Sequence, residues 1–234
     1  MTVLDRATRF TEPAQSRRTR RWVIAIVVLL VLGAAGYVVW FSSLLSVREV
    51  RVLGAVHVSA ESVLQLAAVP ADQQLARVNA AAIASRVGTL PRVESVEVRR
   101  GWPSTLVIVI TERKPVAVVP DGAGFAYVDA QGIRFDNVAK APKGMSVIWA
   151  RDQVSLATAI AIITGLPADW KRQVPLVVAT SRDNVVLQWP PGSTVQWGSA
   201  ERMDMKISVL RALLPQRARR YDVSAPDLPT TSTR

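Results

Sequence analysis

Apolar residues are distributed very differently before and after residue 41. Residues 23–41 form one uninterrupted apolar run of 19 residues without a charge. As a helix this run is roughly 28 Å long, close to the ~30 Å thickness of a bilayer's hydrocarbon core. Trp22 and Trp40 stand at its two ends, where amphipathic rings favour the membrane interface. The pattern therefore predicts a transmembrane anchor over residues 22–45.

The segment before the apolar run is strongly basic. Residues 1–21 carry six arginines and only two acids, and positive charge is retained on the cytoplasmic side of a membrane. We therefore predict a disordered cytoplasmic tail over residues 1–21 and an extracytoplasmic remainder, which is the topology of a single-pass type II protein. The alternative is a cleaved signal peptide. Its apolar region would span about 7–15 residues before small residues, whereas this run is longer and ends in aromatic and β-branched residues, so a retained anchor is favoured.

Short alternating and periodic patterns follow in residues 46–115. Strands are expected where Val, Ile and Thr alternate with polar residues, and helices where apolar positions recur every three or four residues. Ser59 and Asn79 are expected to cap the two helices. The predicted order is strand 47–53, helix 59–67, helix 79–90, strand 96–99 and strand 105–112.

A second unit is predicted over residues 116–225. Residues 125–135 read as a hairpin in which Asp129 begins the turn and Gly132 takes the left-handed position. Helices are expected at 154–165 and after Ser199, the second with an amphipathic stripe that ends at Pro215. Further strands are predicted at 174–179, 184–188, 194–197 and 221–225. Residues 226–234 are rich in Pro and Thr and are predicted to be a flexible tail.

Composition narrows the possible functions. The chain has 234 residues, a formal net charge of +11, one histidine and no cysteine. Disulfides and thiolate metal sites are therefore excluded. The external basic charge is mixed with acids, whereas a nucleic-acid-binding protein would concentrate it in a patch. We expect no metal, no cofactor and no small-molecule substrate.

No catalytic motif is visible. His57 falls in a predicted loop, where an exposed histidine is the simpler interpretation than a member of a catalytic triad. The remaining acids are interpreted as turn formers (Asp121, Asp129 and Asp136) or as the solvent face of strands (Glu94, Glu97 and Glu112). A glycosidase that uses two carboxylates stays open, because its pair could come from any part of the chain. The residues alone indicate a membrane-anchored protein-interaction module rather than an enzyme.

Several segments, in order, resemble the bacterial FtsQ/DivIB cell division family, in its actinobacterial form. These are Phe41–Gly54, Leu90–Leu106, Thr111–Val116, Phe125–Phe135, Gly192–Lys206 and Tyr221–Pro226. The resemblance implies an α+β fold: one N-terminal transmembrane helix, a POTRA domain (β-α-α-β-β) over 46–115, and a C-terminal mixed β-sheet domain with flanking helices over 116–225.

The resemblance also implies a function. The family's members are scaffolds of the divisome, concentrated at the septum of the plasma membrane, which bind FtsB and FtsL and help recruit and regulate the FtsW–FtsI wall synthase. Carried onto this sequence, the partner-binding edge is expected at Tyr221, Asp222, Val223 and Ser224, with Lys206 on the neighbouring helix. Ordinary core packing is the alternative role for Tyr221 and Val223. Two other functions remain open: a wall hydrolase that uses paired carboxylates, and a POTRA-type translocation accessory.

Overall fold

The computed structural model describes residues 15–41 and 45–233. Helix α1 (Gln15–Phe41) begins the described chain, and its segment Arg20–Val38 is long and apolar enough to cross a membrane. The predicted apolar helix is thus confirmed. Residues 15–21, predicted as tail, instead form the first turns of α1, because Gln and Arg are good helix formers that extend the apolar helix. The rest of the predicted tail and the side chain of Trp40 lie outside the described residues.

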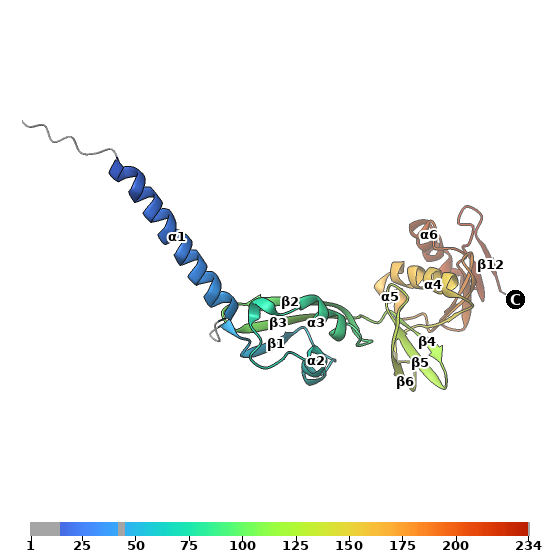
Figure 1. The fold of residues 1–234 in the computed structure, drawn as a ribbon. Coiled ribbons are helices and arrows are strands. Elements are labelled where there is room, and N and C mark those ends of the chain that lie inside the picture. Colours follow the sequence, from blue (N-terminus) through green and yellow to red (C-terminus); the bar gives the residue numbers. More distant parts are fainter. Residues whose placement is uncertain (1–14, 42–44, 234) are drawn as a thin grey trace, which may run out of the picture. The chain divides into compact units, whose positions relative to one another are not determined.

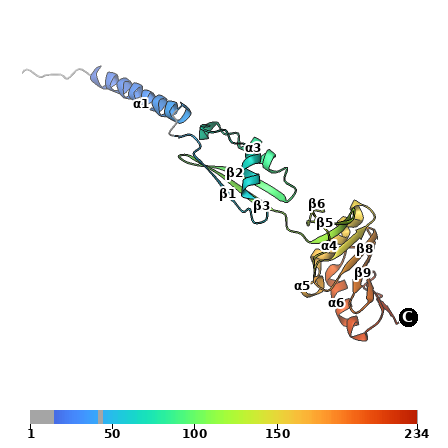
Figure 2. The same ribbon diagram turned by 90° about the horizontal axis from the view of Figure 1, so that it is seen from below.

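Contacts divide the chain into two compact units. The first takes in residues up to Leu53, Ala60–Arg86 and Glu97–Val109, and the second Gly54–Ser59, Val87–Val96 and Ile110–Arg234. There are also two sheets, one of three and one of nine strands. Figure 1 and Figure 2 show both sheets, each with its own helices.

The three-stranded sheet has the predicted β-α-α-β-β order. Its elements are β1 (Glu49–Leu53), α2 (Ala60–Ala67), a 3-10 turn η2 (Leu75–Arg77), α3 (Ala80–Val87), β2 (Val93–Gly101) and β3 (Thr105–Glu112). Strand β3 lies between β1 and β2, and it runs parallel to β1. Alternate residues of β3 are buried (Leu106, Ile108 and Ile110), as the alternating sequence predicts. Asn79 caps α3 as expected, since its Oδ1 accepts from the Ala82 N–H at 3.0 Å.

The nine-stranded sheet is mixed. Its strands are β4 (Ala117–Asp121), β5 (Gly124–Val128), β6 (Arg134–Val138), β7 (Val147–Ala150), β8 (Leu176–Ser181), β9 (Asn184–Trp189), β10 (Ser193–Gln196), β11 (Arg220–Asp222) and β12 (Thr230–Ser232). The spatial order is β12-β11-β10-β9-β8-β7-β4-β5-β6, with β4, β7 and β8 mutually parallel. The predicted hairpin is confirmed: Asp129 accepts from the N–H groups of Gln131 and Ile133, and Gly132 has φ +81°.

Helix α4 (Gln153–Gly165) supplies the centre of the larger core. Seven of its thirteen residues are buried, and the five apolar ones among them form one cluster with side chains of the central strands. Asp152 caps the helix by accepting from the Ser155 N–H at 2.8 Å. A short helix α5 (Ala168–Lys171) and helix α6 (Met203–Leu213) complete the unit, and a 3-10 turn η3 (Leu214–Gln216) continues α6. Figure 1 labels α4, α5 and α6 beside this sheet.

Two predictions for this unit are wrong. Ser199 does not cap α6; the helix begins after Arg202, and Ser199 Oγ instead accepts from the Glu201 N–H in the preceding turn. Residues 226–234 are not wholly a loose tail, because Thr230–Ser232 form β12, paired antiparallel with β11. The turn between Ala225 and Leu228 and the ion pair of Arg202 with Asp227 return this segment to the sheet.

Candidate protein-interaction edge

Strand β12 ends the nine-stranded sheet on one side. It pairs with β11 through three residue pairs, Asp222–Thr230, Tyr221–Thr231 and Arg220–Ser232. All three β12 side chains are exposed and polar. One side of the strand therefore presents main-chain donors and acceptors to solvent, which is the feature that accepts an added strand.

The predicted edge residues lie one strand further in. Strand β11 runs between β10 and β12, so it is an internal strand. Tyr221 is 2% exposed and Val223 is 0% exposed, and both belong to the main core cluster. Only Asp222 and Ser224 reach the surface, where Asp222 Oδ1 accepts from the N–H and hydroxyl of Ser224. Core packing, the alternative kept open for Tyr221 and Val223, is what the structure shows.

The internal position of Val223 changes how the edge must be tested. Its N–H donates to the Gln196 carbonyl at 3.0 Å, on the β10 side. A Val223→Pro substitution would therefore break a bond inside the sheet and reduce stability directly, so it would not test partner binding by itself.

Lys206 is buried, although it carries a charge. Its side chain is 1% exposed, and Nζ donates to the Ser199 carbonyl at 2.8 Å. Burial lowers the pKa of Lys206, and Arg202 lowers it further, while Glu201 and Asp183 act in the opposite direction. Lys206 thus holds the turn before α6 and does not face a partner from the surface.

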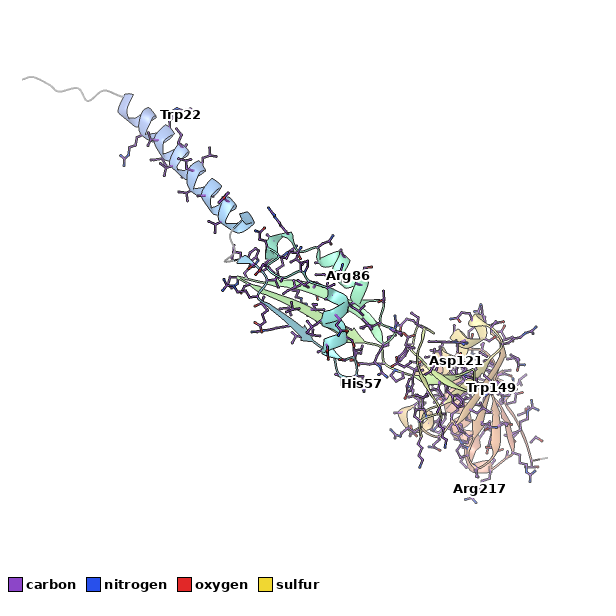
Figure 3. All side chains as sticks on the ribbon, turned by 60° about the horizontal axis from the view of Figure 1, so that its bottom comes forward. Trp22, His57, Arg86, Asp121, Trp149 and Arg217 are labelled. Atoms are coloured by element: carbon purple, nitrogen blue, oxygen red, sulfur yellow. The ribbon has the colours of Figure 1, made fainter. Side chains whose placement is uncertain are left out.

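A cavity of about 760 Å³ opens beside β11. Trp170 and Trp189 line it with their rings edge to face, 5.1 Å between centroids, and the exposed Arg217 and Arg219 also border it. Figure 3 labels Arg217. Sequence reasoning missed this cavity, because its lining comes from three separate segments, 170–173, 189–193 and 214–221. It can accept an apolar side chain next to basic groups.

The residues considered for catalysis have other partners. His57, exposed in the loop between β1 and α2 as predicted, contacts Glu112 through Nδ1 at 2.9 Å. Asp129 holds the hairpin turn. Within residues 15–41 and 45–233, no group of three or more His, Cys, Asp or Glu side chains could hold a metal ion.

The predicted POTRA and C-terminal units both match known families. The family model named POTRA domain, FtsQ-type, matches residues 45–113. The family model named Cell division protein FtsQ/DivIB, C-terminal, matches residues 117–228. A solved structure, the major extracytoplasmic domain of the trans isomer of DivIB from Geobacillus stearothermophilus, is 21% identical. It covers 44% of this chain and 92% of its own, with a TM-score of 0.36.

Relatives that match most of the chain carry the same family name. Cell division protein FtsQ of Mycobacteroides abscessus is 37% identical over 212 residues, covering 88% of this chain and 68% of the relative. The protein of that name from Streptomyces venezuelae is 36% identical over 228 residues, covering 92% and 84%. With both folded units matched in order behind an N-terminal apolar helix, the chain belongs to the FtsQ/DivIB family of cell division proteins.

Proposed function

We propose that this protein is a membrane-anchored divisome scaffold that captures partner proteins along the free edge of β12. Its partners are the division proteins FtsB and FtsL, and through them the FtsW–FtsI wall synthase. The N-terminus is cytoplasmic, the two folded units are extracytoplasmic, and the protein concentrates at the septum. Family membership supports the role in division, and the open edge of the nine-stranded sheet is the observation that carries the binding mode.

The chemistry of β12 suits strand addition. An extended partner segment gains affinity from main-chain hydrogen bonds, whatever the side chains of the edge strand are. The small, exposed threonine and serine side chains of β12 leave room for such a segment. The anchor α1 confines the protein to the membrane, which raises the effective concentration of other membrane-bound partners.

Proline substitutions along β12 test the edge. In an antiparallel edge strand, successive N–H groups point alternately toward the sheet and toward solvent. Of the two variants Thr231→Pro and Ser232→Pro, one therefore removes an N–H group that points toward β11 and the other removes an N–H group that points toward solvent. We expect the variant that loses the outward donor to bind FtsB at least about 10-fold more weakly with an unchanged Tm, because one main-chain bond is lost and the ring obstructs pairing.

The other variant is the matched control, since it loses a bond to β11 and should show a lower Tm. Binding is measured between the full-length protein in lipid nanodiscs and FtsB–FtsL from the same host. If neither proline changes the affinity, FtsB does not bind at β12.

A further inference from the structure

A crevice lies where strands β4 and β7 end. These two strands and β12 lie on opposite sides of the central strand of the nine-stranded sheet. The crevice encloses about 310 Å³ and is lined by Pro120, Arg134, Trp149, Arg151 and Gln153, among others. Strands β4 and β7 are parallel, so their carboxyl ends meet at this edge. The chain leaves β4 toward β5 on one side and leaves β7 through α4 toward β8 on the other.

One large apolar side chain of the crevice lining is exposed, and so are two that are sequence neighbours of lining residues. Trp149, on β7, is 57% exposed. Figure 3 labels this residue. Val154, in the first turn of α4, is 60% exposed, and Ile133, which precedes Arg134, is 45% exposed. A cluster of this kind with a polar rim is typical of a protein-binding surface, and tryptophan is the residue most enriched among binding hot spots.

The charged rim of the crevice is basic. In the described part of the chain, neither the Arg134 nor the Arg151 guanidinium forms a hydrogen bond, although the charge of Arg151 interacts with the neighbouring Asp152, whose pKa is lowered first by its bonds to Ser155 and also by Arg151. Asp152 is the acid within the lining, and its carboxylate is already used to cap α4 through the N–H and hydroxyl of Ser155. The two exposed guanidiniums are thus available to carboxylates of a partner, with which arginine forms bidentate bonds.

From these observations we infer that this crevice is a second docking surface, separate from the β12 edge. Its partner is a protein segment that places an apolar anchor against Trp149 and carboxylates against Arg134 and Arg151. The exposed indole of Trp149 favours a protein over a small polar ligand, because aromatic side chains are enriched in the cores of protein interfaces.

Photo-crosslinking in the host tests this surface. The full-length protein carries p-benzoylphenylalanine in place of Val154, and adducts are identified by mass spectrometry of the joined peptides. We expect an adduct with a partner segment that contains acidic and apolar residues. Trp149→Ala should reduce its yield at least about 10-fold. Trp102→Ala is the matched control, since Trp102 is 55% exposed on the β2–β3 turn, and should leave the yield unchanged.

Charge reversal identifies the contact chemically. Arg134→Glu combined with Arg151→Glu should abolish the adduct, and replacing the partner's acids by lysine should restore it. Tm measurements on each variant establish that the fold is retained, and FtsB binding establishes separately that the β12 edge is intact. An adduct only with a second copy of this chain, only with lipid or glycan, or with no dependence on Trp149 and the arginines would overturn the inference, as would no adduct.

Discussion

Replacing Lys206 by alanine lowers the free energy of unfolding by about 3 kcal/mol, the range expected when a long buried side chain is truncated. The side chain is 1% exposed, so its methylenes pack in the core around α6. The alanine variant also leaves the Ser199 carbonyl without its donor. Chemical denaturation of the full-length protein measures the change.

Lys206→Met separates packing from charge. Methionine retains most of the buried volume, so only the bond to Ser199 is lost, at about 1 kcal/mol. Because the folded state lowers the pKa of Lys206, it releases this proton at a lower pH than the unfolded chain does. The stability of the wild-type protein relative to the methionine variant should therefore increase as the pH rises toward 10.5. If Lys206→Met instead abolishes partner binding with an unchanged Tm, Lys206 contacts the partner directly.

Glu112→Ala should destabilise the protein by about 2 kcal/mol, because one carboxylate holds the whole loop after β1. Oε1 accepts from the N–H groups of Val56, His57 and Val58 at 2.7, 2.7 and 2.9 Å. The loop must also pass close to β3: a Cβ on Gly54 would lie 2.1 Å from the Ile110 carbonyl oxygen, and Gly54 has φ +81°. The backbone conformation of Gly54 directs the loop along β3, and the Glu112 carboxylate accepts hydrogen bonds from the loop N–H groups that would otherwise have no partner.

The pH dependence of stability tests the Glu112 contacts directly. Burial alone would raise the pKa of Glu112, but the three backbone N–H groups and His57 outweigh it and lower the pKa to about 2. Its contribution is therefore complete above the unfolded-state value near 4.5 and is lost as the pH falls toward 2. The stability difference between wild type and Glu112→Gln should shrink as the pH falls below 4.5. A difference that does not change with pH would contradict this role.

The sequence predicts elements best where one face of a strand or helix is buried. Strand β3 is predicted at its exact bounds, because apolar and polar residues alternate along it. Strands β4 and β7 were not predicted. β4 has buried residues on both faces, with Ala117, Val118 and Val119 all at 3% exposure or less, and a strand buried on both faces shows no alternation of apolar and polar residues.

The candidate site is harder to predict than the fold, because it depends on which strand lies at the sheet edge. The apolar pattern of Tyr221 and Val223 correctly indicates a strand, but pattern alone does not give its neighbours. Strand β12 has no apolar residue, and it forms through backbone pairing and the ion pair of Arg202 with Asp227, at 2.5 and 2.8 Å. A contact between two residues that lie 25 positions apart, such as Arg202 and Asp227, produces no recognisable pattern in the local sequence.

Depletion of the protein in its own host, while a fluorescent fusion is followed in dividing cells, tests the divisome role most directly. A divisome scaffold should concentrate at midcell before constriction, and its loss should give filamentous or branched cells without septa. Uniform fluorescence over the envelope together with normal septation on depletion would contradict the role in division.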